Sequence, residues 1–495
     1  MAYLKTTILF GFCWMICHTV VAQIDTLALQ RLQKQIDTLQ NSPFLQNGMV
    51  GASVKQVKSG KILLQYQHQK SLAPASTMKL ITTAAALSVL GESYRYQTSL
   101  EYEGDIIDGI LRGNIYIKGT GDPSLGSNRH AGFPDYSAIF DKWIAKLKEI
   151  GIKEIQGSVI ADASLFEENA PPNTWNWNDM GNYYGAGAFG LNVNENLFKV
   201  VFKSGKVGEN TTVVRTEPEL PFLEFINHVS TDKPNTGDQT IFYSRPYDSQ
   251  VLFEGTIPAG VAEFSVKGSI PDPAYWLAYM FQQKLLDAKL TVCEEPTTVF
   301  RIKQKYHRFQ SPKANVLDVV YSPFLMDLIK QCNFQSINLY AESFLKTLSI
   351  KLGSDNTTYE GIKVLKQIWQ SKGIDLSGFN PKDGSGLSTV SSITADNMTS
   401  ILSKMGNEPY FQTYYYSIPV LGESGTVRNL GKSSRAAGNV HAKSGSIEGV
   451  RAYAGYFTSK SGELYCFSFM LNRYNSDLGN ATKALEKLMV MLADL

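Results

Sequence analysis

The chain has 495 residues, and its 47 Lys and Arg against 45 Asp and Glu leave a formal net charge of only +2. With 43% hydrophobic and 19% charged residues it has a globular composition, which excludes wholesale disorder, a fibrous repeat and a many-span membrane protein. The near-neutral charge predicts no nucleic-acid partner, and six His and five Cys argue against metal-rich chemistry.

The N-terminus is typical of a secretory signal peptide. Lys5 supplies a positive charge, residues 8–17 are almost wholly apolar, and Val20-Val21-Ala22 offers small residues to a signal peptidase. We expect a signal peptide over 1–22, cleavage near Ala22 and a periplasmic protein. A membrane anchor is disfavoured because the apolar run is short. A lipoprotein is disfavoured because no small residues precede Cys17. Membrane contact by the rest of the chain stays open.

Three cysteines would remain in the mature chain: Cys293, Cys332 and Cys466. None belongs to a C-x-x-C pair, so the sequence supports neither a metal knuckle nor a redox motif. One disulfide among them is compatible with export, but the sequence does not assign it. The fold must therefore depend on an ordinary hydrophobic core.

Alternation and helical periodicity predict the following elements in chain order. A hairpin covers 48–67, and a helix covers 76–90 and ends at Gly91. The middle, 94–270, is rich in glycine and in short strand-like pieces. Helices are then expected at 272–288, 336–352 and 394–405, strands at 439–445, 450–457 and 464–471, and a last helix at 481–495.

Strands and helices of similar kind thus open and close the mature chain. The simplest packing pairs the two ends in one antiparallel sheet of about five strands covered by helices, an α+β fold. The middle is then a large, mainly β insertion that forms one or two extra domains. We expect a first catalytic part over 23–93, the insertion over 94–270 and a second catalytic part over 271–495.

The chemistry-bearing candidate is Ser76-Thr77-Met78-Lys79 at the start of a helix. Residues three apart on a helix are neighbours, so the Lys79 amine reaches the Ser76 hydroxyl. Serine needs a base to become a nucleophile, and lysine can be that base if burial lowers its pKa. The apolar residues around Ser76 provide such a setting. The same spacing recurs at 230–233 and 343–346, where a solvated helix face is the simpler interpretation.

Two further motifs follow in order. Ser336-Ile337-Asn338 begins an amphipathic helix, while a second S-x-N at 354–356 reads as a polar loop. Lys443-Ser444-Gly445-Ser446 lies in a strand, where glycine lets a ligand approach closely. Three other Lys-Ser-Gly copies look like hairpin tips. They begin at Lys58, Lys203 and Lys460.

In this order the motifs resemble the active-site-serine penicillin-recognising enzymes: S-x-x-K, S-x-N and K-[ST]-G. The roughly 260 residues between the first two motifs resemble the class C low-molecular-mass penicillin-binding proteins, the D-Ala-D-Ala carboxypeptidase/endopeptidase family typified by penicillin-binding protein 4. Further stretches look like the same family, and together they cover essentially the whole mature chain. They lie at 119–125 (GTGDPSL), 177–186, 192–196, 383–388 (DGSGLS) and 422–427. Ser444 stands where many members have Thr, and it keeps the hydroxyl.

The resemblance implies roles for the motif residues. Ser76 is the nucleophile that forms an acyl-enzyme, Lys79 its base, and Ser336 a proton relay that Lys443 supports electrostatically. Asn338 binds the substrate backbone. Ser444, Gly445 and Ser446 receive the terminal carboxylate and the extended peptide, with the N–H groups of Ser76 and Ser446 as oxyanion hole. No cofactor and no metal are implied.

Asp179 matches a family position that binds the free amine of the stem-peptide diamino acid, since a carboxylate is the natural partner of a cationic side chain. Tyr184 and Trp177 are candidates for the walls of that pocket. The alternative is that the aromatic residues here only form the core of the insertion. Asp383 is expected to set up a turn with Gly384.

The resemblance thus implies a periplasmic serine peptidase with peptidoglycan stem peptides as substrates and β-lactam antibiotics as covalent inhibitors. The alternatives are a β-lactamase or esterase on the same scaffold, or a non-catalytic cell-wall binding protein. The balance between carboxypeptidase and endopeptidase activity stays open, because both would use one acyl-enzyme.

Overall fold

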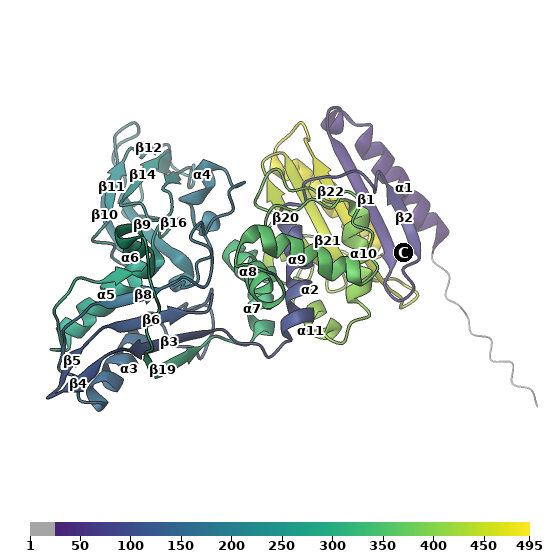
Figure 1. The fold of residues 1–495 in the computed structure, drawn as a ribbon. Coiled ribbons are helices and arrows are strands. Elements are labelled where there is room, and N and C mark those ends of the chain that lie inside the picture. The colour runs from purple at the N-terminus through teal and green to yellow at the C-terminus, as the bar shows by residue number, and fades with distance from the viewer. Residues whose placement is uncertain (1–24) are drawn as a thin grey trace, which may run out of the picture.

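The computed structural model describes residues 25–495, so the expected signal peptide and its cleavage site lie outside the described residues. Two lobes are visible in Figure 1, with the N-terminal strands in purple beside the C-terminal strands in yellow. One lobe contains the five-stranded sheet β2-β1-β22-β21-β20, in which every neighbouring pair is antiparallel. Its strands are β1 (Met49–Gln56), β2 (Ile62–Tyr66), β20 (His441–Ile447), β21 (Val450–Thr458) and β22 (Leu464–Asn472).

Helices cover both faces of this sheet. One core joins α1 and α12 to the sheet, and another joins α2, α7, α8, α9 and α10 to its opposite face. The α+β fold predicted from the sequence is confirmed. The helices are α1 (Thr26–Gln40), α2 (Met78–Leu90), α7 (Leu325–Gln335), α8 (Asn338–Leu352), α9 (Thr358–Ser371), α10 (Ala395–Met405), α11 (Phe411–Tyr416) and α12 (Leu478–Leu492).

Helix α1 is not among the elements expected from the sequence, although its pattern is readable. Asp25 caps its first turn by accepting hydrogen bonds from the backbone N–H groups of residues 27 and 28. Its buried residues recur every three or four positions, as one face of an amphipathic helix requires. They are Ala28, Leu32, Ile36 and Leu39.

The other lobe is the insertion, and its sheets are short and mixed. It holds the sheets β18-β8-β6-β3-β19, β17-β7-β5-β4, β10-β9-β16, β11-β14-β13 and β12-β15. Its elements are β3 (Gln97–Tyr102), β4 (Asp105–Ile107), β5 (Ile110–Arg112), β6 (Ile115–Gly119), α3 (Tyr136–Glu149), β7 (Glu154–Ile155), β8 (Val159–Asp162), α4 (Trp177–Met180), β9 (Leu197–Lys203), β10 (Thr212–Glu217), β11 (Glu224–Asn227), β12 (Ser230–Asp232), β13 (Ile241–Tyr243), β14 (Gln250–Glu254), β15 (Thr256–Pro258), β16 (Phe264–Ser269), α5 (Pro273–Asp287), β17 (Thr291–Val292), β18 (Thr297–Thr298), α6 (Val299–Tyr306) and β19 (Asn315–Tyr321).

The insertion extends beyond residue 270, where the sequence placed its end. Trp276 and Phe281 of α5 are buried in the insertion core, and β19 pairs with β3 along its whole length. The sequence signal misled because α5 has the same helical pattern as the catalytic helices, and pattern alone does not say which core a helix joins. We therefore propose an insertion from β3 to β19, about residues 97–321.

The insertion is fastened to α8 by a buried lysine. Lys346 is fully buried, and its Nζ donates to the carbonyl oxygens of Ala170 at 2.9 Å and Ala188 at 3.1 Å. Its Nζ also lies 3.2 Å from a carboxylate oxygen of Glu167. Lys346 is the lysine of the S-x-x-K copy at 343–346. It lies in the core, not on the solvated helix face expected from the sequence.

Replacing this buried cation should loosen the contact between the two lobes. We expect Lys346→Met to lower the free energy of unfolding by about 3 kcal/mol, because two buried carbonyl groups and Glu167 lose their partner. Urea unfolding measures this loss. The matched control is Lys363→Met, whose half-exposed amine lies 3.3 Å from Glu360, and a smaller loss is expected there because water replaces the lysine. Equal losses in both variants would contradict the fastening role.

Candidate active site

The first motif lies where a one-turn helix leads into α2. Ala75 adopts a φ of +45°, a left-handed conformation that is strained for a residue with a side chain. The turn presents Ser76 at the surface of the site, where it is partly exposed, while Lys79 is fully buried one turn later. The motif therefore combines an accessible hydroxyl with a desolvated amine.

The Lys79 amine contacts three segments of the chain. Its Nζ lies 2.8 Å from Ser76 Oγ, 2.5 Å from Asn338 Oδ1 and 3.0 Å from the carbonyl oxygen of Ser385. Burial lowers the pKa of Lys79 from 10.5 to about 8, and the nearby Cys332, Asp383 and Glu342 partly offset this effect. The pKa of the amine is therefore close to neutral pH, which suits proton transfer from serine.

The second motif lies at the junction of α7 and α8. Ser336 ends α7 in a left-handed conformation, with a φ of +60°, and Asn338 begins α8. The Asn338 side chain bridges the two lobes, because its Oδ1 accepts from Lys79 and its Nδ2 donates to the Tyr184 carbonyl oxygen at 2.7 Å. The insertion therefore reaches the reacting groups through its backbone.

The third motif is part of the edge strand β20. Lys443 Nζ donates to Ser336 Oγ at 2.8 Å and to the Ser444 carbonyl oxygen at 2.7 Å. Burial, reinforced by the charge of Lys79, lowers the pKa of Lys443 well below its usual value. Ser444 Oγ donates to the Thr426 hydroxyl at 2.7 Å, which explains the presence of Thr426 in the stretch 422–427.

Gly445 lets β20 lie against the turn that carries Ser76. A Cβ at Gly445 would lie 2.7 Å from the Pro74 carbonyl oxygen and 3.0 Å from the backbone nitrogen of Ser76. These neighbours are backbone atoms, so a side chain does not fit there without movement of the strand or the turn. Glycine is needed here for the approach of two backbones within the protein itself.

The outer edge of β20 is covered by residues 419–421 at its start and is open from Ser444 onward. The Ala442 N–H turns away from β21 and donates to Pro419, and backbone groups on a strand alternate in direction. The N–H groups of Ser444 and Ser446 therefore face outward as well. Ser446 itself is exposed at the end of the strand. Such an edge accepts an extended peptide by strand addition.

The residues expected to form a specificity pocket belong to α4 and the turn after it. Asp179 is half-buried, and burial raises its pKa, although hydrogen bonding from Tyr184 and Asn176 opposes that shift. Burial and the Asp179 carboxylate raise the pKa of Tyr184. Trp177 is 51% exposed and stacks on Tyr243, with ring centroids 6.1 Å apart. Trp177 and Tyr184 are therefore surface residues of the insertion, and its hydrophobic core lies elsewhere.

Two buried carboxylates lie behind this site, and sequence reasoning missed one of them, Glu342. Glu342 lies one turn after Asn338 and accepts from the backbone N–H groups of Gly384 and Ser385. Asp383, expected only to form a turn, accepts from the Gly386 and Ser388 N–H groups and from the indole of Trp175. The i, i+4 spacing of Asn338 and Glu342 was the available signal.

The remaining sequence candidates lie apart from this constellation. Residues 354–356 form a bend after α8, and the other Lys-Ser-Gly copies start at or beside turns. Cys293, Cys332 and Cys466 are all free, so they form no disulfide. Within residues 25–495, no three His, Cys, Asp or Glu side chains group closely enough to hold a metal ion, and no helix is long and apolar enough to span a membrane.

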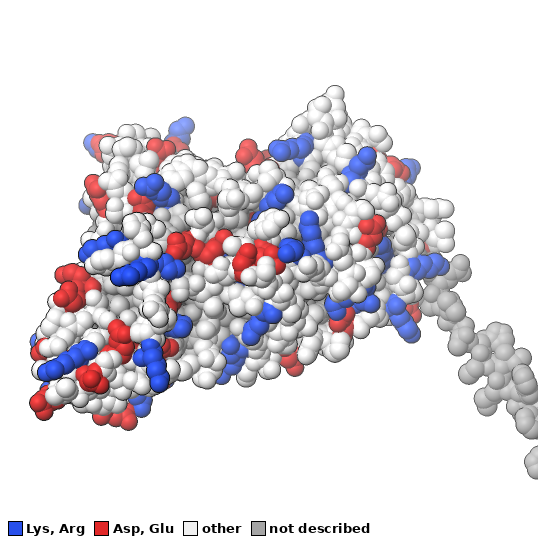
Figure 2. All heavy atoms as spheres, viewed as in Figure 1, with Lys and Arg blue, Asp and Glu red and all other residues white. Residues whose placement is uncertain are grey.

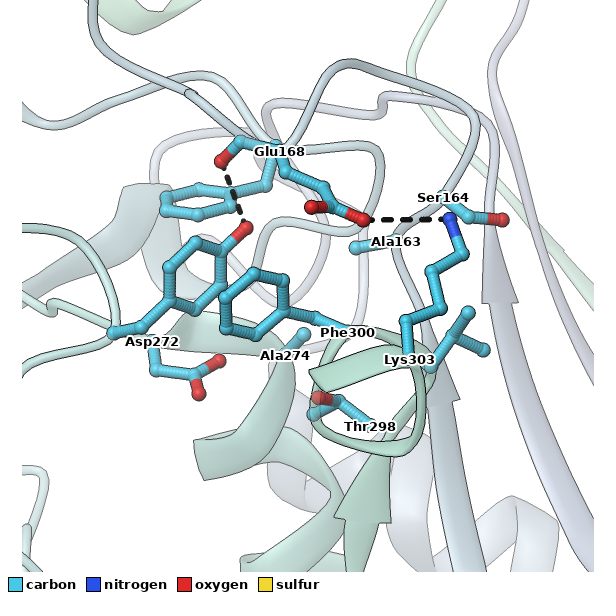
Figure 3. Close-up of a pocket in the computed structure, with 11 residues that line it drawn as sticks. Ala163, Ser164, Glu168, Asp272, Ala274, Thr298, Phe300 and Lys303 are labelled. Atoms are coloured by element: carbon cyan, nitrogen blue, oxygen red, sulfur yellow. Dashed lines mark hydrogen bonds and ion pairs between the residues drawn. The ribbon is translucent and has the colours of Figure 1, made fainter. Parts of the chain in front are cut away.

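A separate cavity of about 20 Å³ lies in the insertion, against α6 (Figure 3). Phe300 and Tyr247 stack on each other in its wall, and Lys303 pairs with Glu168 at 3.3 Å. It has room for about one water molecule and is lined by none of the motif residues.

The face shown in Figure 2 carries interspersed Lys, Arg, Asp and Glu side chains.

Almost the entire chain matches one known protein family. The model of the D-Ala-D-Ala carboxypeptidase 3 (S13) family matches residues 32–493. The chain is 27% identical over 473 residues to a D-alanyl-D-alanine carboxypeptidase of Actinomadura sp. (strain R39), covering 92% of this chain and 83% of that protein. It is 25% identical over 438 residues to the D-alanyl-D-alanine carboxypeptidase DacB of Haemophilus influenzae, covering 88% of each.

Solved structures agree on the fold. The crystal structure of penicillin binding protein 4 from Haemophilus influenzae superposes with a TM-score of 0.77 at 23% identity, covering 94% of this chain and 99% of that one. The same protein complexed with a β-lactam gives a TM-score of 0.74 at 22% identity, covering 93% and 97%.

The close approach at Gly445 should be sensitive to a single methyl group. We expect Gly445→Ala to lower the free energy of unfolding by about 1–3 kcal/mol, because the new Cβ overpacks against backbone that does not yield easily. Chemical denaturation measures this. The control is Gly479→Ala in α12, where the new Cβ would lie 3.1 Å from the movable Asp477 carboxylate and alanine favours the helix, so a smaller loss is expected. Unchanged stability of Gly445→Ala would show that β20 and the serine turn are not in tight contact.

Proposed function

Because the chain belongs to the D-Ala-D-Ala carboxypeptidase 3 (S13) family, the class C low-molecular-mass penicillin-binding proteins, and is a serine-type D-alanyl-D-alanine carboxypeptidase, we propose that it acts through an acyl-enzyme on Ser76. The observation that carries this proposal is the position of the Lys79 amine, 2.8 Å from Ser76 Oγ and 2.5 Å from Asn338 Oδ1. Peptidoglycan stem peptides ending in D-Ala-D-Ala are the proposed substrates.

The acylation step follows from these contacts. Lys79, as a neutral amine, takes the proton of Ser76 while Oγ attacks the carbonyl carbon between the two D-alanines. The N–H groups of Ser76 and Ser446 stabilise the oxyanion, and such a donor is typically worth about 10²–10³ in rate. The C–N bond then breaks, and the proton that Lys79 took passes through Ser336 to the leaving amine, which leaves Lys79 neutral again. Water finally hydrolyses the ester and frees Ser76.

Lys443 and β20 orient the reactants in this scheme. The contact of Lys443 Nζ with Ser336 Oγ supports a relay in which the lysine holds the hydroxyl towards the leaving group. The open edge of β20 supports binding of the substrate as an added strand, with Ser444 and Ser446 at its terminal carboxylate. Gly445 keeps the strand close enough to the nucleophile for both to contact one substrate.

Penicillin is proposed to acylate the same serine, and the protein is proposed to act in the periplasm after export. The apolar pattern of residues 8–17 supports export. D,D-endopeptidase activity is a second candidate, favoured by the open edge of β20, which accepts an extended peptide by strand addition. A β-lactamase or esterase is less well supported, because the carboxypeptidase family model matches residues 32–493. A wall-binding protein is less well supported, because Ser76 and Lys79 are both present and lie 2.8 Å apart.

Labelling with fluorescent penicillin tests the nucleophile. The wild-type protein should become covalently labelled, and Ser76→Ala should remain unlabelled because no other hydroxyl is paired with Lys79 in the described network. The matched control is Ser230→Ala, which removes the serine of another S-x-x-K copy and should label like the wild type. An unlabelled wild type, or equal labelling of Ser76→Ala, would overturn the proposed function. Mass analysis of digested peptidoglycan then separates carboxypeptidase from endopeptidase products.

The role of Asp179 is testable with paired substrates. We propose that its carboxylate binds the free amine of the stem-peptide diamino acid. Asp179→Ala should lower kcat/KM by about tenfold or more for D-Ala-D-Ala peptides with a free side-chain amine. The matched substrate is the same peptide acetylated on that amine, for which little change is expected. Equal losses with both peptides would exclude an amine-binding role.

A further inference from the structure

A buried carboxylate on α8 lies behind the reacting groups and has no part in the scheme above. Glu342 is fully buried, one helical turn after Asn338. Its Oε1 accepts from the Ser385 N–H at 2.8 Å, and its Oε2 accepts from the Gly384 N–H at 3.0 Å. Both carboxylate oxygens are therefore committed to one short stretch of backbone.

That stretch of backbone leads directly to the Lys79 amine. The Ser385 carbonyl oxygen accepts from Lys79 Nζ at 3.0 Å. The neighbouring carbonyl of Gly384 is held separately, because Thr82 Oγ1 donates to it at 2.7 Å. A charged side chain thus holds the N–H groups of this backbone segment, and a neutral one holds a carbonyl group within it. The two contributions can be separated by mutation.

The electrostatic surroundings make the charge of Glu342 relevant to Lys79. Burial and the neighbouring Asp383 carboxylate raise the pKa of Glu342 to about 7. Glu342 in turn opposes the lowering of the Lys79 pKa by burial. The other ionisable groups that face Glu342 and Lys79 come from α7, α8, β20 and the 383–388 loop. They are Cys332, Lys346, Lys443 and Asp383.

We propose that Glu342 is a positioning residue for acylation, which fixes the Ser385 carbonyl against the Lys79 amine and places a negative charge behind it. The inference rests on the proposed role of Lys79 as base. The carboxylate favours the protonated amine and therefore sets the pH above which Lys79 is free to accept the serine proton. Its backbone contacts hold the amine in reach of Ser76 in either protonation state.

The test is the pH dependence of acylation by a fluorescent penicillin. In the wild type the rate should rise with pH and level off above about pH 8, where the Lys79 amine is neutral. Glu342→Gln removes the negative charge, so the Lys79 pKa should fall further and the acid limb should move about one pH unit lower. Glu342→Asp keeps the charge and should move the limb less, whatever it does to the maximum rate.

The matched control is Thr82→Val, which removes the other tether of the same backbone without changing a charge. It should lower the maximum rate and leave the acid limb at the wild-type pH. An acid limb that does not move in Glu342→Gln, or that moves equally in Thr82→Val, overturns the inference. A purely structural role for Glu342 predicts the second of these results.

A second measurement decides the question if Glu342→Gln does not fold. Coupling between two titrating groups is reciprocal, so removal of the Lys79 charge must alter the titration of Glu342. Infrared difference spectra of the carboxyl band, assigned by its shift in Glu342→Asp, should show Glu342 titrating at higher pH in Lys79→Met than in the wild type. Identical titration in both overturns the inference.

These measurements separate the two proposals. A wild-type protein that is not labelled by penicillin contradicts the proposed function, and the infrared titration alone then decides whether Glu342 and Lys79 are coupled. A labelled wild type with an unmoved acid limb leaves the proposed function standing and removes the role of Glu342.

Discussion

The site depends on one buried amine. Lys79 is fully buried, yet its Nζ has three oxygen partners, on Ser76, Asn338 and Ser385. A buried ammonium without partners would be very costly, and a fully paired one would hold its proton too firmly to act as base. A pKa of about 8 for Lys79 requires burial to outweigh nearby negative charge by a limited amount. Each partner comes from a different segment, so the amine is correctly placed only when those segments are packed together.

The two lobes are joined where this balance is set. The Tyr184 carbonyl oxygen accepts a hydrogen bond from Asn338, and the Trp175 indole donates one to Asp383. The Asp383 carboxylate also accepts from backbone N–H groups of the 383–388 loop. Lys346, two turns beyond Asn338 on α8, fastens the same helix to insertion backbone. The insertion therefore contributes directly to the geometry of the site. A catalytic lobe separated from it would lose partners for groups that are buried in the intact protein.

The open edge of β20 and the serine turn impose the complementary constraint. A strand edge that binds peptide must lie near the nucleophile, and here only a missing side chain at Gly445 allows that distance. The strain at Ala75 and the left-handed conformation of Ser336 occur at the same place. Strained backbone persists where surrounding packing determines it, and here that packing comes from α2, α8 and β20 together.

The sequence by itself determined the order of the three motifs, the hairpin and helices around them, and the union of both chain ends in one sheet, because these depend on local periodicity and on residue chemistry. It did not determine the end of the insertion, since the pattern of α5 is the same whichever core buries it. It favoured Lys79 over Lys346 by the flanking residues, but it expected Lys346 on a solvated helix face, whereas that lysine is fully buried. Only the tertiary structure places one beside Asn338 and the other among carbonyl groups, and only there does Glu342 face the loop that touches Lys79. The proton affinity of a lysine depends on what surrounds it in space, and that is decided by packing between segments hundreds of residues apart.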